Sequence, residues 1–162
     1  MATFEQCTEL SRQLGDLLLQ KGWRVGTAES CTGGLLAAAI TDIAGSSAWF
    51  EEGLVTYANQ SKQSLLGVED TQLLEHGAVS QTVVESMAAG VIARGADLAL
   101  ATSGIAGPDG GTPDKPVGTV WMAWATQTGV QSAVRCFEGS RSQVRFQACK
   151  WLFGAVLADL TT

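Results

Sequence analysis

The sequence predicts an α/β protein of three layers, in which helices cover both faces of a mixed sheet of about five strands. Residues 3–21 and the segment after Ser80 repeat apolar side chains at helical spacing. Short apolar segments separate these helices, and two strand-like segments flank a turn at Thr128 and Gly129. No repeat, low-complexity tract or linker divides the chain, so residues 1–162 are expected to form one domain.

Local patterns predict each element in turn. Gly22 ends the first helix, and Asn59, Ser80 and Ser140 are the expected N-caps of later helices. The nearly all-apolar segment at 97–102 is typical of a strand buried on both faces. In chain order we expect a helix at 3–21, a strand at 23–28, a helix to about 43, a strand at 50–58, a short helix from Asn59, a helical turn around 73–76, a helix from Ser80 to Gly95, a strand at 97–102, a hairpin of 118–127 and 130–137, and a helix from Ser140.

The composition excludes several classes of protein. Hydrophobic residues make up 46% and charged residues 16%, which indicates a compact globular chain. The net charge of −6 disfavours binding to nucleic acid, because the phosphate backbone requires a basic surface. No apolar run reaches the ~18 residues of a membrane span. The four cysteines form no CxxC pair and there is one histidine, so we expect no metal or cofactor, and a cytoplasmic protein with free thiols.

The stretch from Thr27 to Gly34 is rich in polar and glycine residues and lies between a predicted strand and a predicted helix. Such a turn directs backbone N–H groups and the positive end of a helix dipole to one place, where a phosphate or carboxylate can bind. The alternative is that Ser30 or Thr32 only caps the helix. Capping needs one such residue and not eight, which favours a loop that faces a ligand.

A second candidate ligand loop covers residues 103–116 and contains all three prolines of the chain. It directly follows the buried strand at 97–102, and ligand loops of open α/β sheets follow the carboxyl ends of strands. Loops of this length inside a compact domain are usually either functional or disordered. We interpret this one as functional.

The residues do not offer a Ser-His-Asp triad, because the only histidine, His76, lies in a surface connection. A serine nucleophile can instead use a desolvated lysine as its base, since burial lowers the pKa of lysine. Lys62 is the best of the four lysines for this role, and Tyr57 is placed to orient it or relay a proton. Ser30 competes with the pair Ser46–Ser47 as the nucleophile, and the residues alone leave that choice open.

Arg141 and Arg145 lie four residues apart near the start of the last predicted helix. Their charges oppose the helix dipole there, so they do not stabilise the helix. Either they pair with acidic neighbours such as Glu138 or they bind an anion.

Several motifs together resemble the CinA C-terminal domain family. They are Thr27–Gly34, the Ala44–Phe50 turn, Val55–Asn59 with Lys62 following, Gly77–Ser80, and Ser103–Gly111 with Lys115–Val120. The resemblance covers nearly the whole chain with its motifs in the family's order. Stand-alone members of this family are nicotinamide-nucleotide amidohydrolases of the PncC type. We expect the chain to be similar to these stand-alone members, without the molybdopterin-binding-like domain of full-length CinA proteins.

The resemblance implies a set of site residues. It places the catalytic serine at Ser47, with Tyr57 and Lys62 as its partners. The cationic pyridinium ring of the substrate that it implies suits an acidic or aromatic neighbour, for which we choose Glu29. The residues that it implies for substrate binding are Glu29, Ser30, Thr32, Gly33, Gly34, Ser103, Gly104, Gly107, Gly110, Gly111 and Arg145, with Arg141 second to Arg145 as a phosphate ligand. Ser103 stands where many relatives carry threonine, which keeps the hydroxyl group.

The function implied is hydrolysis of nicotinamide mononucleotide to nicotinate mononucleotide and ammonia, through a serine nucleophile assisted by lysine and tyrosine. Nicotinamide mononucleotide is then the expected small-molecule partner, with no nucleic acid and no membrane, and the family implies a homo-oligomer, a dimer. The alternative from a different class is a nucleotide-binding or competence-associated interaction module without turnover.

Overall fold

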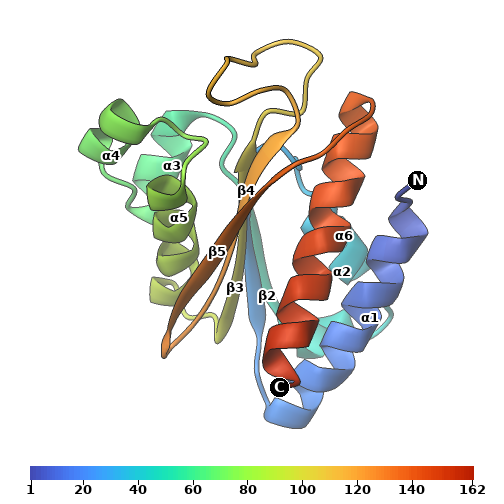
Figure 1. Ribbon diagram of the computed structural model, residues 1–162. Helices are drawn as coiled ribbons and strands as arrows, with labels where there is room; N and C mark the ends of the chain where they lie inside the picture. Colours follow the sequence, from blue (N-terminus) through green and yellow to red (C-terminus); the bar gives the residue numbers. More distant parts are fainter.

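The computed structural model describes residues 1–162, which form one mixed sheet between two layers of helices (Figure 1). The helices are α1 (Phe4–Lys21), α2 (Leu35–Thr41), α3 (Asn59–Leu66), α4 (Asp70–His76), α5 (Gln81–Ala93) and α6 (Arg141–Leu160), and a 3-10 turn, η1, spans Ser46–Ala48. The strands are β1 (Val25–Glu29), β2 (Phe50–Val55), β3 (Leu98–Gly104), β4 (Thr119–Thr126) and β5 (Gly129–Cys136).

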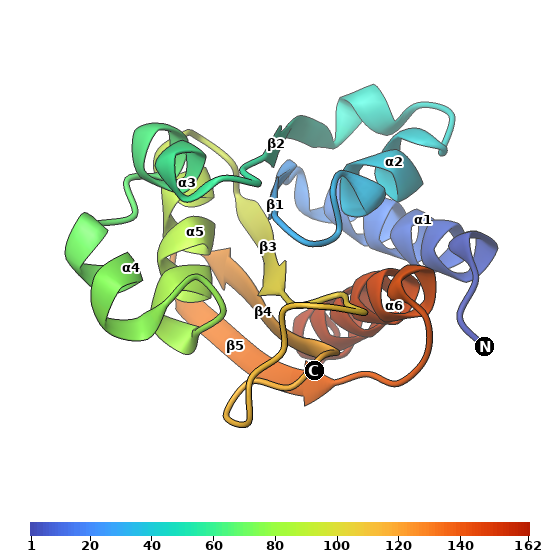
Figure 2. The same cartoon turned by 90° about the horizontal axis from the view of Figure 1, so that it is seen from above.

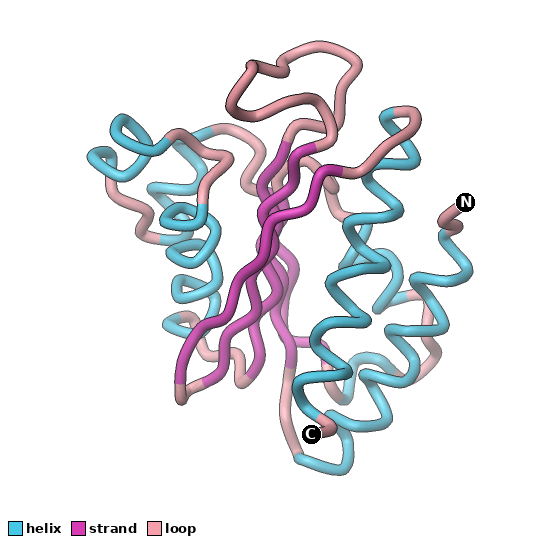
Figure 3. Tube along the Cα trace, viewed as in Figure 1, coloured by secondary structure: helices cyan, strands magenta, loops and turns pink.

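The sheet has the order β2-β1-β3-β4-β5. Strand β1 pairs parallel with β2 on one side and with β3 on the other, whereas β3-β4 and β4-β5 are antiparallel. Figure 3 shows the sheet between the two helical layers. The predicted three-layer fold with a mixed five-stranded sheet is therefore confirmed.

Each face of the sheet has its own core. Helices α1, α2 and α6 cover one face and enclose the larger cluster, which includes Leu14, Trp49, Met122 and Phe153. Helices α3, α4 and α5 cover the other face around Met87. None of the helices is both long and apolar enough to span a membrane.

The helix ends follow most of the predicted capping signals. Gly22 ends α1 in the left-handed conformation, and the hydroxyls of Ser80 and Ser140 accept N–H bonds at the starts of α5 and α6. Asn59 is a correction, because it is the first residue of α3 and the N-cap position belongs to Ala58. The expected strand at 50–58 ends earlier, at Val55, which leaves Thr56 and Tyr57 outside the sheet.

Strand β1 is where the order of connections along the sheet reverses. The chain leaves β1 to form β2 on one side and later returns as β3 on the other, and all three strands are parallel. Their carboxyl ends therefore lie at one edge of the sheet, at a switch point of the kind where open α/β sheets bind ligands. Seen from above, the segment between β3 and β4 crosses this edge (Figure 2).

Candidate active site

Ser30 is the first residue after β1 and lies at the switch point of the sheet. Its backbone is held on two sides: its N–H donates to Thr102 O of β3 at 3.1 Å, and its carbonyl accepts from Gly33 N at 3.0 Å. The N–H groups of Cys31 and Thr32 donate to no backbone carbonyl. The turn thus fixes the serine and presents two unused backbone donors beside it.

Lys62 lies in helix α3, which follows β2, and its side chain contacts Ser30. Its Nζ lies 3.2 Å from Ser30 Oγ, 2.8 Å from Thr56 O and 3.3 Å from Tyr57 O. As an ammonium, Lys62 donates to all three oxygens; as a neutral amine it donates to the two carbonyls and can accept from the serine hydroxyl. The arrangement is that of a serine with a lysine base.

The surroundings of Lys62 favour its neutral form. The residue is 1% exposed, and no carboxylate makes an ion pair with it. Burial lowers the pKa of Lys62 below its ordinary value of 10.5, because desolvation disfavours the ammonium. A lysine in this state can accept the proton of a hydroxyl group.

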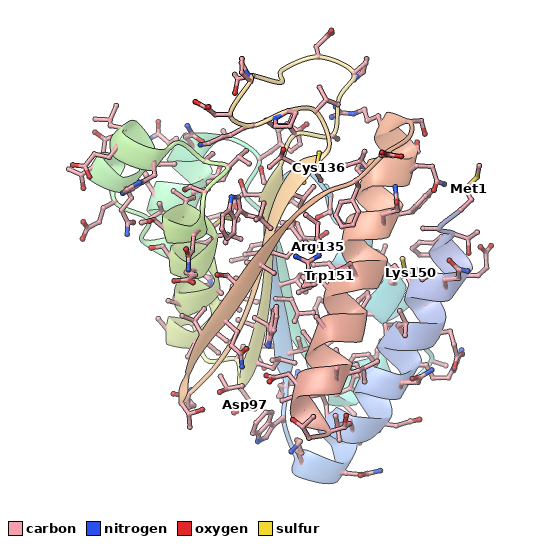
Figure 4. The ribbon with its side chains drawn as sticks, viewed as in Figure 1. Met1, Asp97, Arg135, Cys136, Lys150 and Trp151 are labelled. Carbon is pink, nitrogen blue, oxygen red and sulfur yellow. The ribbon has the colours of Figure 1, made fainter.

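Ser47 lies at the opposite edge of the sheet, so the grouping of Ser47 with Tyr57 and Lys62 needs correction. Ser47 precedes β2 and its carbonyl accepts from Arg24 Nη1, whereas Tyr57 and Lys62 follow β2. The N–H of Arg24 also binds Asp97, which Figure 4 labels at the lower end of the sheet. The six residues of β2 place these two ends about 20 Å apart at ~3.3 Å per residue.

Glu29 is buried in the protein interior and does not face a pyridinium ring, which corrects its expected role. The residue is 1% exposed, and its carboxylate accepts from Leu36 N at 2.9 Å, Ala37 N at 3.1 Å and Thr32 Oγ1 at 2.6 Å. Burial raises the pKa of Glu29, and these bonds partly offset that effect. Glu29 therefore occupies the N-terminus of α2, which is not free to bind an anion as expected.

Thr32 joins this buried group. Its hydroxyl lies between the Glu29 carboxylate and Thr102 Oγ1, 2.8 Å away, and the residue is fully buried. Thr32 thus supports the turn from inside and does not face a ligand. Cys31 is also buried, which raises the pKa of its thiol to about 12 and keeps it protonated.

Arg145 supports the same turn from the side of α6. Its Nε donates to Cys31 O at 3.0 Å and its Nη2 donates to Thr32 O at 3.1 Å. A Cβ at Gly33 would lie 3.2 Å from the same guanidinium. The Arg145 guanidinium therefore stabilises the turn by hydrogen bonds to its backbone carbonyls.

Arg141 and Tyr57 meet across the mouth of the site. Arg141 Nη2 donates to Tyr57 Oη at 3.0 Å, and its Nη1 donates to Gly107 O at 2.7 Å. Tyr57 is 58% exposed, so its ring projects from the sheet edge. Gly107 holds φ at +86°, and a Cβ there would lie 2.4 Å from Val117, so glycine is required at this position.

These groups enclose a cavity of about 260 Å³. Its walls are Ser30 and Cys31 from the turn, Tyr57, Arg141, and Gly104, Ile105, Ala106, Gly107, Asp109 and Gly110 from the β3–β4 connection. The structure therefore brings Ser30, Gly104, Gly107, Gly110 and Arg141 to one cavity, as the expected substrate site requires. Larger hollows elsewhere, such as one of about 660 Å³ between α1 and α6, contain no candidate nucleophile beside a base.

Several expected lining residues lie outside the cavity. Ser103 is 1% exposed and donates to Ala78 O at 2.8 Å, so it ties β3 to the start of the α5 region. Gly33, Gly34 and Gly111 do not line the cavity either. No cluster of three or more His, Cys, Asp or Glu side chains is arranged to hold a metal ion.

A family model described as the CinA C-terminal domain matches residues 7–159. The chain belongs to the CinA C-terminal domain family.

Curated relatives and solved structures of this family cover most of the chain. The chain is 58% identical over 153 residues to "Nicotinamide-nucleotide amidohydrolase PncC" of Enterobacter agglomerans, a match that covers 93% of each protein. It is 55% identical to the protein of the same name from Escherichia coli strain K12, over 90% of each. The crystal structure of competence damage-inducible protein A from Klebsiella pneumoniae superposes with a TM-score of 0.92 at 39% identity, covering 96% of this chain and 97% of that one. The crystal structure of competence/damage-inducible protein CihA from Agrobacterium tumefaciens superposes with a TM-score of 0.92 at 40% identity. The match covers 97% of this chain and 96% of that one.

Two features of this CinA C-terminal domain were not found from its sequence. Asp109 lines the cavity, although the loop sequence gave no reason to choose it over its neighbours. The buried role of Glu29 also had no clear signal, because a charged residue in a polar turn is normally expected at the surface.

Proposed function

We propose that this chain is a nicotinamide mononucleotide amidohydrolase in which Ser30 is the nucleophile and Lys62 its general base. The observation that carries the proposal is the contact of Ser30 Oγ with the buried Lys62 Nζ at the switch point of the sheet. The substrate comes from the relatives, whose name describes amidohydrolases of nicotinamide nucleotides.

The first half of the reaction forms an ester on Ser30. Neutral Lys62 takes the hydroxyl proton while Ser30 Oγ attacks the carboxamide carbon. The N–H of Cys31, which lines the cavity next to Ser30 and donates to no backbone carbonyl, stabilises the negative oxygen of the tetrahedral intermediate. Lys62 then returns the proton to the departing nitrogen, which leaves as ammonia.

The second half releases the acid. A water molecule gives a proton to Lys62 and attacks the ester carbon, and the bond to Ser30 Oγ breaks as the proton returns to the serine. The products are nicotinate mononucleotide and a regenerated enzyme. Asp109, the carboxylate that lines the cavity, takes the place of Glu29 as the anionic neighbour of the cationic pyridinium ring.

Ammonia release from nicotinamide mononucleotide tests the assignment. Ser30→Ala is expected to lose at least about a thousandfold in kcat, as for removal of a nucleophile. Ser47→Ala is the matched control, because it removes the same hydroxyl group at the far edge of the sheet, and it is expected to keep wild-type turnover. Folding of each variant is checked by circular dichroism and thermal unfolding.

Two other outcomes of these measurements would contradict the proposal. Full activity in Ser30→Ala together with loss of activity in Ser47→Ala would show that Ser47, in the turn before β2, is the nucleophile. A wild-type protein that binds the nucleotide and releases no ammonia would favour the binding module without turnover.

A further inference from the structure

The larger hollow between α1 and α6, called the α1–α6 groove below, has the size of a small-molecule site. Its volume of about 660 Å³ lies within the ~300–1,000 Å³ that is usual for such sites. Most of the residues that line it are hydrophobic, among them Leu10 of α1, Trp151 of α6 and Phe137 just before α6. The groove shares no lining residue with the cavity beside Ser30, so the proposed hydrolysis does not use it.

Trp151 gives the groove an aromatic wall that is already fixed in place. Its ring packs against the ring of Trp124 in β4, with the centroids 6.3 Å apart, and the guanidinium of Arg135 in β5 lies 4.6 Å from its centroid. The side chain is held by these neighbours and is only half-buried. In Figure 4 the labelled Trp151 and Lys150 lie on α6, next to the labelled Arg135. A ring held in this way can stack on a flat aromatic ligand with little loss of conformational entropy.

Gly154 keeps the groove open. It is an interior residue of α6, where glycine costs about 0.5–1 kcal/mol relative to alanine. A Cβ at Gly90 of α5 would collide with Leu66 O, so close packing explains that glycine, whereas a Cβ at Gly154 would meet nothing within 4 Å. No neighbour inside the protein therefore requires glycine at this position. The missing side chain instead leaves space in the groove, which a ligand can occupy.

The charge of the groove favours an anion. Lys150 is the only charged side chain that lines it, and Lys150 takes part in none of the four ion pairs of the structure. No acidic side chain lines the groove, although the chain as a whole has a net charge of −6. Gln147 also lines it, but its amide nitrogen donates to two backbone carbonyls. Lys150 is thus the group that remains to bind a negative charge, and Arg135 adds a second positive charge beside Trp151.

We propose that the α1–α6 groove binds a small aromatic monoanion, with its ring on Trp151 and its negative group at Lys150. The apolar walls bury the body of such a ligand, and the single unpaired ammonium matches its single charge. A second copy of the chain fits less well, because a two-fold contact through this groove would bring its own Lys150 to the same place, where the like charges repel. The inference does not depend on the proposed function, since the groove and the cavity beside Ser30 have no residue in common.

The test uses two fluorescent probes that differ only in a sulfonate group: anilinonaphthalene sulfonate and the neutral phenylnaphthylamine. Gly154→Leu fills the groove and is expected to weaken the binding of both probes at least about tenfold, with Gly154→Ala intermediate. Lys150→Gln is expected to weaken the binding of the sulfonate by about three- to tenfold and to leave that of the neutral probe within about twofold.

Two matched controls accompany these variants. Ala93→Leu adds the same side chain as Gly154→Leu at an exposed position of α5, on the other face of the sheet, and Lys21→Gln removes an exposed lysine that lies over Trp23 and not in the groove. Both should bind the two probes as wild type does. Circular dichroism and thermal unfolding check that every variant is folded.

Binding of the sulfonate that is unchanged in Gly154→Leu and Gly154→Ala would place the probe elsewhere on the protein and overturn the inference, as would no binding to wild type. Equal affinity of wild type for the two probes, or an equal loss of both in Lys150→Gln, would show that the groove does not select an anion. Sedimentation that finds a dimer of the wild type, separated into monomers by Gly154→Leu, would assign the groove to a second copy and refute the proposal.

Discussion

Ser30 Oγ and Lys62 Nζ lie 3.2 Å apart although 32 positions separate them in the chain. Each follows the carboxyl end of one of two adjacent parallel strands, β1 and β2, so the sheet itself brings them together. Backbone bonds hold both partners: Ser30 N binds Thr102 O, and Lys62 Nζ binds the carbonyls of Thr56 and Tyr57. This rigid support keeps the proposed nucleophile and its proposed base in contact before any substrate enters.

The first prediction concerns the pH dependence of activity. Lys62 accepts a proton only when neutral, and burial lowers its pKa below 10.5. We expect kcat/KM for nicotinamide mononucleotide to rise about tenfold per pH unit below the pKa of Lys62 and to level off above it. The midpoint should lie clearly under 10.5, and Ser47→Ala should show the same profile. A rate that does not change between pH 6 and 10 would contradict the role of Lys62 as base.

A second prediction links the same lysine to stability. Because the folded pKa of Lys62 is below the unfolded value of 10.5, the unfolded chain binds more protons between these two pH values. The free energy of unfolding of wild type must then rise with pH in this window, whereas below the folded pKa the cost of burying the charge is fully present. Lys62→Met lacks this titration.

The measurement is urea unfolding of wild type and Lys62→Met from pH 7 toward 10.5. We expect the difference in free energy of unfolding, wild type minus variant, to become more positive as the pH rises. A difference that stays constant would mean that the lysine is not desolvated in the folded protein.

A third prediction tests the buried carboxylate of Glu29, which lies beside the proposed nucleophile Ser30. Glu29→Gln replaces one carboxylate oxygen with an amide NH2 group, which then faces the N–H of Leu36 or of Ala37. One backbone donor loses its acceptor, at a cost of about 1–3 kcal/mol. We expect lower stability in urea unfolding and lower kcat, because the same turn carries Ser30. Glu75→Gln, an exposed change, serves as the control, and an equally small effect in both would contradict the buried role of Glu29.

The fold was predictable from the sequence because it depends on periodicity and on short-range signals. The helical spacing of α1 and the caps Ser80 and Ser140 appear in the structure as expected. The apolar run after Asp97 became the buried strand β3. The position of Asn59 differed by one residue, because Ala58 has the extended backbone of a cap.

The site was predictable in part. Lys62, Tyr57, Arg141 and the glycine loop were expected at one place, and they gather at the carboxyl edge of the sheet. The separation of Ser47 from them was also within reach of the sequence, because a strand was predicted between Ser47 and Tyr57 and a strand holds its two ends far apart. The burial of Glu29 could not be predicted from the sequence, since it depends on how α2 packs against β1 and β3.

The last prediction concerns the support of Lys62 by helix packing. Helices α5 and α6 each contain an interior glycine, which makes a matched pair. A Cβ at Gly90 would lie 2.3 Å from Leu66 O of α3, whereas a Cβ at Gly154 would meet nothing within 4 Å. Gly90→Ala must push α3 away and should cost about 1–3 kcal/mol of stability. Gly154→Ala should raise stability by up to about 1 kcal/mol, because alanine favours the helix.

Activity separates the two glycine variants further. Lys62 lies in α3, so displacing that helix moves its amine from Ser30, and a shift of about 1 Å in such a group can cost about a hundredfold in rate. We therefore expect Gly90→Ala to lose kcat even under conditions where it is fully folded, and Gly154→Ala to retain it. Urea unfolding and ammonia release measure both effects on the same samples. Equal stability and equal kcat in the two variants would show that the close contact of α3 and α5 does not position the lysine.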